Sequence, residues 1–103
     1  MIADTTNFYA RVDGALSRRE VADLYASAGW SMRKCGWDEF EVRCATGELV
    51  IESERPILVH GPVSEIASNV DRVVEPLRSA KLAFSAECYD DDRRLIRTVA
   101  STD

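Results

Sequence analysis

The segment Leu82–Val99 constrains the fold most, because it has the pattern of two strands joined by a tight turn. Apolar residues occupy every second position between Leu82 and Cys88, and the side chains of a strand point alternately to its two faces. The aspartates Asp90–Asp92 follow, and short polar side chains of this kind favour turns. A second strand is expected over Arg94–Val99. Such a hairpin has one apolar face, so other elements must cover it.

A first helix is predicted over residues 17–28. Ser17 and Glu20 have the spacing of a capping box, in which each side chain satisfies a free backbone N–H at the start of a helix. Val21, Leu24 and the residues that follow at helical spacing form one apolar stripe. The helix can therefore bury one side against a sheet.

A second helix is predicted over residues 64–79, with Ser64 as its N-cap. Pro76 is expected to kink its last turn, because proline removes one hydrogen bond of the helix. A shorter helix that begins near Ser68 is the alternative.

The remaining strands alternate in the same way as the first. They are expected over residues 8–13, 39–44, 48–52 and 57–60. The stretch Trp30–Asp38 is expected to be an extended approach to a strand or an irregular loop. The predicted order is strand, helix, three strands, helix, two strands.

We therefore expect a single α+β domain over residues 1–103, built as a two-layer sandwich. Its sheet is predicted to be mostly antiparallel, with both helices packed on one face and the other face open to water. The architecture resembles a ferredoxin-like α-β plait with an extra strand.

The charge of the chain limits its partners. The net charge is -5 and the sequence pI is about 4.9, which disfavours nucleic acid because that needs clustered Lys and Arg. A basic protein partner fits this charge. No apolar run approaches the roughly 20 residues that a membrane span requires, so neither nucleic acid nor membrane is expected as a partner.

The cysteines and the histidine show no metal-binding or catalytic pattern. The three cysteines form no CxxC pair, and His60 is the only histidine, so no metal and no cofactor are expected. Cys44 and Cys88 lie on the apolar phase of their strands and are predicted to be buried and reduced, which suits the cytoplasm. Cys35 follows two basic residues but has no base spaced to activate it. His60 is expected to be structural or solvated, and Asp90–Asp92 to form a solvated turn rather than a cation site.

The outward phase of the strands is the candidate binding surface. It carries tyrosines and arginines, which are common in interface hot spots, although alternating charges also simply solubilise a sheet. The predicted partner-binding residues are Tyr9, Arg11, Glu39, Glu41, Arg43, Glu52, Glu87, Tyr89 and Arg97. The region Trp30–Trp37 is the alternative interface.

These observations favour a small acidic binding protein of the cytoplasm that is not an enzyme, as a monomer or a homodimer. The expected role is that of an inhibitor, such as an immunity protein that neutralises a basic toxin or enzyme. As a second interpretation, the predicted order of elements over residues 17–99 resembles that of the class I type III secretion chaperones, and this resemblance implies a chaperone role. A small enzyme or ligand-binding domain of the α/β-plait type is the third.

Overall fold

The computed structural model describes residues 5–14, 16–37, 39–53 and 55–101. Within these residues neither helix is long and apolar enough to cross a membrane. The elements follow one another as β1 (Phe8–Asp13), α1 (Arg18–Ser27), β2 (Ser31–Gly36), β3 (Glu39–Cys44), β4 (Gly47–Glu52), β5 (Ile57–Gly61), α2 (Ile66–Ser79), β6 (Ala83–Tyr89) and β7 (Leu95–Ala100).

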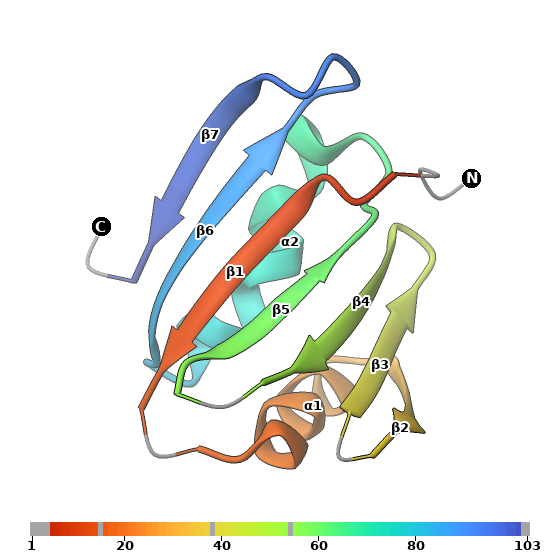
Figure 1. Ribbon diagram of the computed structural model, residues 1–103, viewed down its shortest axis with the longest axis vertical. Helices are drawn as coiled ribbons and strands as arrows, with labels where there is room; N and C mark the ends of the chain where they lie inside the picture. Colours follow the sequence, from red (N-terminus) through yellow and green to blue (C-terminus); the bar gives the residue numbers. More distant parts are fainter. Residues whose placement is uncertain (1–4, 15, 38, 54, 102–103) are drawn as a thin grey trace.

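The seven described strands form one sheet in the order β2-β3-β4-β5-β1-β6-β7, and every neighbouring pair is antiparallel. Both helices lie behind the sheet in Figure 1, so they cover one face and leave the face toward the viewer uncovered. The predicted α+β architecture with two layers is confirmed.

The hydrophobic core lies between the sheet and the helices. The alternate residues Phe8, Ala10 and Val12 of β1 point into it, as do Val70, Val73 and further residues of α2. Tyr25 of α1 is fully buried, and its hydroxyl donates a hydrogen bond to the Val73 carbonyl oxygen at 2.8 Å. Burial of apolar surface is the main stabilising contribution in such a core.

The first helix begins as predicted. The Ser17 side chain accepts a hydrogen bond from the Glu20 backbone N–H at 3.1 Å, and the Glu20 carboxylate accepts one from the Ser17 N–H at 2.9 Å. The capping box is therefore confirmed.

The second helix begins later than predicted. Its N-cap position is Glu65 rather than Ser64, and Glu65 has a left-handed backbone with a φ of 48°. Pro76 is buried inside α2, whose last residue is the predicted Ser79.

The strand β2 was not expected as a regular element. The structure therefore has four strands between the helices, whereas the sequence pattern predicted three. The order of elements behind the chaperone resemblance is not the observed one. The strand order also differs from that of a ferredoxin-like plait.

Asn7 joins the start of β1 to the segment before α2. Its side-chain amide donates to the Val63 carbonyl oxygen and accepts from the Val63 N–H, each at 2.8 Å. On the other side, the neighbours of Val63 bond to the β3–β4 hairpin through Glu48 and Thr46. The buried Asn7 amide thus satisfies the backbone N–H and carbonyl groups of Val63, as the backbone of an adjacent strand would do.

Candidate binding face

The uncovered face of the sheet carries a row of side chains, one from each of the seven strands. Each of these residues lies directly opposite the next one in the register of the neighbouring strand. Along each strand, the residues on either side of the row point to the other face of the sheet. This central row consists of Arg33, Glu41, Val50, His60, Tyr9, Glu87 and Thr98. Strands lie about 4.8 Å apart, so the row extends over roughly 29 Å.

Three aromatic side chains, those of Tyr9, His60 and Tyr89, form a cluster on this face. The Tyr9 ring stacks on His60, with centroids 6.4 Å apart, and meets Tyr89 edge to face at 5.7 Å. Tyr9 is 42% exposed. The cluster is rigid because the rings are held by β5, β1 and β6, which are neighbours in the sheet.

Two carboxylates border this aromatic cluster. Glu87 accepts a hydrogen bond from the Tyr89 hydroxyl at 3.2 Å, and a Glu52 oxygen lies 3.3 Å from Nε2 of His60. Burial of the hydroxyl, and then the bond to Glu87, raise the pKa of Tyr89. The negative charge of Glu87 therefore acts directly on the aromatic cluster.

Glu41 is engaged within the sheet. Its two carboxylate oxygens each accept a hydrogen bond from the Arg33 guanidinium at 3.2 Å. This bond raises the pKa of Arg33. Glu41 is therefore less available to a partner than Glu87 or Glu52.

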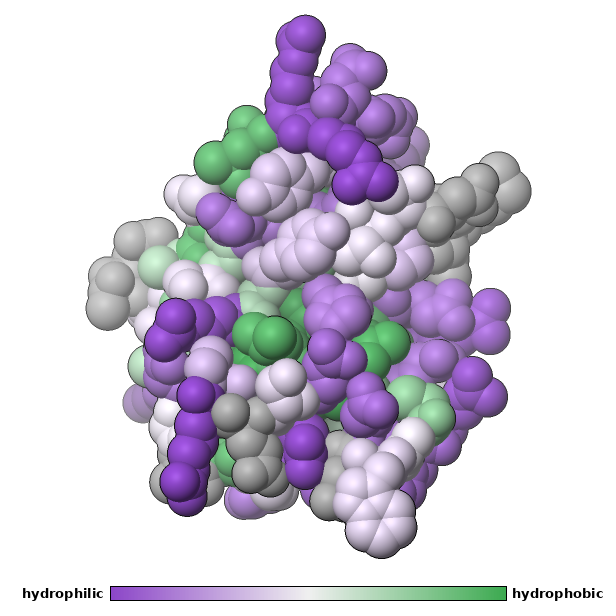
Figure 2. Space-filling view, viewed as in Figure 1, coloured by the Kyte–Doolittle hydropathy of each residue, from purple (hydrophilic) through white to green (hydrophobic). Residues whose placement is uncertain are grey.

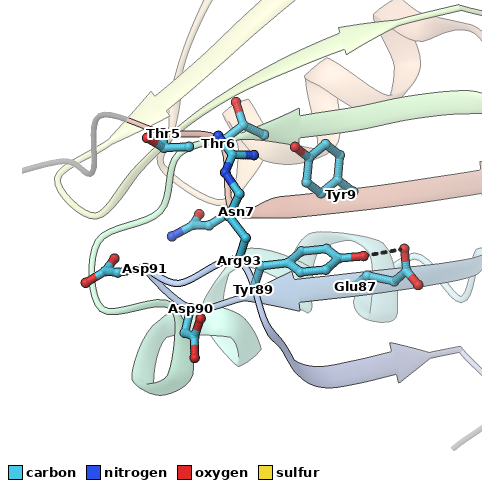
Figure 3. Close-up of a pocket in the computed structure, with 9 residues that line it drawn as sticks. All are labelled: Thr5, Thr6, Asn7, Tyr9, Glu87, Tyr89, Asp90, Asp91 and Arg93. Carbon is cyan, nitrogen blue, oxygen red and sulfur yellow. Dashed lines mark hydrogen bonds between the residues drawn. The ribbon is translucent and has the colours of Figure 1, made fainter.

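A hollow of about 690 Å³ lies at the start of β1 and the end of β6, beside Tyr9 and Tyr89. Figure 3 shows the two rings on neighbouring strands, with Arg93 extending from the β6–β7 turn toward Thr6. A second hollow of about 560 Å³ lies over β1, β6 and β7, where the paired residues Ser85 and Ala100 have small side chains.

Acidic groups are in excess on this face. Among the described strand residues, six carboxylates and three guanidinium groups have the outward phase. They are Asp13, Glu39, Glu41, Glu48, Glu52 and Glu87, with Arg11, Arg33 and Arg43. Figure 2 shows hydrophobic atoms near the middle of the face, surrounded by hydrophilic side chains.

The structure brings together only part of the predicted binding set. Tyr9, Glu87, Tyr89 and Glu52 lie around the aromatic cluster, and Arg11 lies beside them on β1, 3.5 Å from Asp13. The predicted residues on β3, which are Glu39, Glu41 and Arg43, face the same way but are separated from β1 by two strands.

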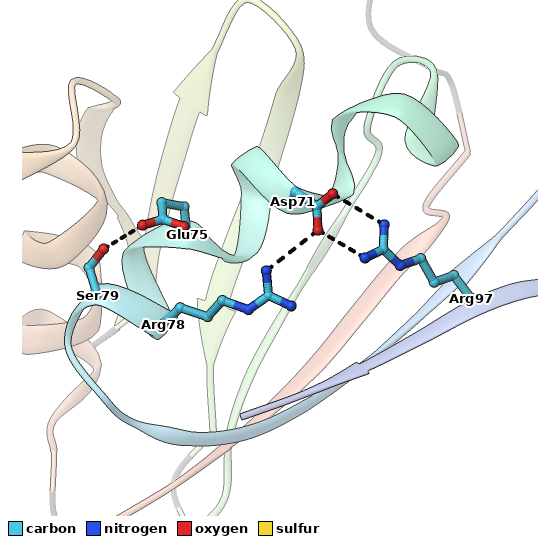
Figure 4. A network of polar contacts seen from close by, with 5 residues as sticks. All are labelled: Asp71, Glu75, Arg78, Ser79 and Arg97. Carbon is cyan, nitrogen blue, oxygen red and sulfur yellow. Dashed lines mark hydrogen bonds and ion pairs between the residues drawn. The ribbon is translucent and has the colours of Figure 1, made fainter. Parts of the chain in front are cut away.

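The predicted position of Arg97 on the open face is wrong. It lies opposite Cys88, which points into the core, so its side chain leaves the sheet on the helix side. Its guanidinium reaches Asp71 of α2 at 2.9 Å, and Asp71 also contacts Arg78, as Figure 4 shows. An edge strand allows this, since no further strand covers that side of β7.

The binding face also includes residues that the sequence analysis did not select. Leu58 and His60 point outward and alternate with Ile57, Val59 and Gly61, which are buried. The period of two in this short strand was the available signal. Arg33 was missed because β2 was not recognised as a strand.

The alternative interface around Trp30–Trp37 is divided. Trp30 is buried against Tyr25, with ring centroids 5.0 Å apart, whereas Trp37 is 90% exposed at the turn after β2. The Lys34 ammonium lies 5.9 Å from the Trp37 ring centre. Of the two tryptophans, only Trp37 is exposed and can contact a partner in the folded chain.

Cysteine burial partly follows the prediction. Cys88 is buried, Cys44 is half-buried with its sulfur 3.2 Å from the Thr46 hydroxyl, and Cys35 is exposed. In the part of the chain that the structure describes, no three His, Cys, Asp or Glu side chains gather where a metal ion could bind. The aspartates after β6 form a turn, in which an Asp90 oxygen accepts from the backbone N–H groups of Asp92 and Arg94 at 2.9 Å each.

Comparison of the chain with protein-family models, with curated proteins and with solved structures finds no match in any of the three.

Proposed function

We propose that this chain is a small acidic protein that acts by binding a basic protein partner with the open face of its sheet. The observation that carries the proposal is the aromatic cluster of Tyr9, His60 and Tyr89, which lies on a rigid, uncovered face beside a hollow. Tyrosines held in this way lose little conformational freedom on binding.

The charge of the face supports a basic partner. Carboxylates outnumber arginines there by six to three among the described strand residues, and the whole chain carries a net charge of -5. Complementary charge steers association, while buried aromatic anchors slow dissociation. Within this class we favour an inhibitor that occludes the active surface of a basic toxin or enzyme, as an immunity protein does, in the cytoplasm.

The arrangement of charges favours binding over catalysis. His60 is held by Glu52 and stacked on Tyr9, and Glu41 is paired with Arg33 across two strands. These contacts orient the side chains of a flat surface, and the hydroxyl of Tyr89 is likewise directed to Glu87.

The proposal is tested by capturing the partner on the tagged chain in its native cells and then measuring binding kinetics with purified components. Replacing Tyr9 and Tyr89 together by alanine should raise the dissociation rate by roughly 700-fold, since such anchors contribute about 2 kcal/mol each and about 1.4 kcal/mol is a factor of ten. The matched control is Trp37→Ala, which removes an exposed aromatic residue outside this face.

Charge reversal gives a second, independent readout. Glu52→Lys with Glu87→Lys should lower the association rate about tenfold at low salt, and the difference should shrink as salt increases. Asp23→Lys with Glu75→Lys makes the same charge change on α1 and α2 and should leave the rate within a factor of about two. If Trp37→Ala weakens binding while the tyrosine pair does not, the interface lies at the β2–β3 hairpin instead.

A further inference from the structure

The hollow beside Tyr9 and Tyr89 has the features of a receptor for one cationic side chain. The two rings stand almost perpendicular, at 86°, and so form two walls of a corner. Aromatic faces attract cations through the negative potential above the ring, and arginine is the most frequent partner.

Carboxylates complete the site on two sides. Glu87 lies at the hydroxyl end of Tyr89, and Asp91 lies across the hollow in the β6–β7 turn. Asp90 also lines the hollow, but one of its oxygens already accepts two backbone N–H bonds within the turn. The carboxylates of Glu87 and Asp91 therefore remain to bind a charged ligand.

Arg93 lines the same hollow and carries a positive charge, opposite to that of the carboxylates. It is exposed, and its side chain extends across the hollow in Figure 3. The chain itself thus already supplies one cation to the lining of this hollow. The positive charge of Arg93 opposes an incoming cation, but three carboxylates line the hollow, so the local charge stays negative.

We propose that this hollow binds an arginine side chain of the basic partner, with its guanidinium against the Tyr9 and Tyr89 rings and directed to Glu87. The inference rests on the proposed function, because it names the group that the partner places there. Arginine fits better than lysine, since its planar guanidinium stacks on aromatic rings and bonds a carboxylate with two N–H groups.

The test is an NMR titration of the full chain with N-acetyl-arginine amide, followed through the backbone and the tyrosine ring signals. N-acetyl-citrulline amide, which has the same shape without the charge, and N-acetyl-lysine amide are the comparison probes. We expect saturable shifts at Tyr9, Tyr89 and Glu87 with the arginine probe, weaker ones with lysine and none with citrulline.

Variants make the assignment specific. Glu87→Gln and Tyr9→Leu should each weaken binding of the arginine probe about three- to tenfold. Arg93→Gln should tighten it, because it removes the competing cation, and this gain is not expected of a residue that merely supports the fold. Glu48→Gln, on the same face but on β4, is the control and should change nothing.

Equal shifts with the citrulline probe, or unchanged affinity in both Glu87→Gln and Arg93→Gln, would overturn the inference. Each variant is checked for native signal dispersion, and if Tyr9→Leu does not fold, the three probes on the unaltered chain still decide. If the partner covers the open face but the arginine probe does not bind, only this inference fails. If the probe binds but the partner covers another surface, the proposed function fails.

Discussion

Replacing Asn7 by alanine should destabilise this protein more than any other change of a single polar side chain near its N-terminus. The Asn7 amide is buried and forms two hydrogen bonds of 2.8 Å with the backbone of Val63, which is itself fully buried. Alanine would leave a buried N–H and a buried carbonyl group without partners. An unsatisfied buried group costs about 1–3 kcal/mol, so the expected loss for the two groups is about 2–6 kcal/mol.

This loss is measured as the change in the free energy of unfolding by urea denaturation. With a slope of about 1–3 kcal/mol per M, the midpoint should fall by roughly 1 M or more. Asn69→Ala is the matched control, because it also removes a hydrogen bond from a side-chain amide to a backbone carbonyl. The Asn69 amide donates to the Ser64 carbonyl oxygen at 2.6 Å, but at a half-buried position. Water can replace that bond, so we expect a loss below about 1 kcal/mol. Equal, small losses in the two variants would refute the role given to Asn7.

Three further predictions concern the helix cap, the thiols and the Asp71 cluster. Ser17→Ala should lower the free energy of unfolding by about 1 kcal/mol, because it removes the observed cap of α1; Ser27→Ala, at the other end of the helix, is the control, and an equal effect of both would contradict the cap. Thiol labelling at pH 8 should be fast at Cys35 and slowest at Cys88, because burial raises the pKa of Cys88 to about 11. Rapid labelling of Cys88 in the folded chain would show that this residue of β6 does not point into the core. The hydrogen bond from Arg97 lowers the pKa of Asp71, so the ionised carboxylate should stabilise the fold above its unfolded pKa of about 3.9, and this stabilisation should be lost as the pH falls through the lower folded pKa. In Arg97→Gln, NMR titration should show the pKa of Asp71 rising toward its ordinary value. An unchanged pKa would disprove the contact.

The local elements were predictable where the alternation was strict. The strand before Cys88 and the strand around Val42 place apolar residues at every second position, and burial follows that pattern. The cap of α1 was equally clear, because Ser17 and Glu20 interact only with the local backbone. Short-range signals of this kind do not depend on the rest of the fold.

Edge strands were predicted less well. In β2 only Met32 is partly buried, and a register shift near Cys35 interrupts the pattern. In β7 a charged residue was expected to face water on the open side, but Arg97 contacts Asp71, which is 26 residues away in the sequence. Such long-range ion pairs leave no mark in the local pattern.

The sequence predicts which side chains of the candidate site face outward, but it does not predict which of them lie next to one another. The outward phase of Tyr9, Glu87 and Tyr89 follows from the sequence, whereas their proximity depends on β1 lying between β5 and β6. That strand order also brings His60 against Tyr9 and creates the hollow at the ends of β1 and β6. Only the tertiary structure contains this information.

The most direct test of the central claim is hydroxyl-radical footprinting of the chain alone and in its complex with the captured partner. This measurement reports the solvent exposure of individual side chains. We expect the side chains of Tyr9, Tyr89, Leu58 and His60 to lose reactivity in the complex, while Trp37 keeps its reactivity. Unchanged reactivity of Tyr9 and Leu58, together with protection of Trp37 or of the helices, would contradict the claim that the open sheet face binds the partner.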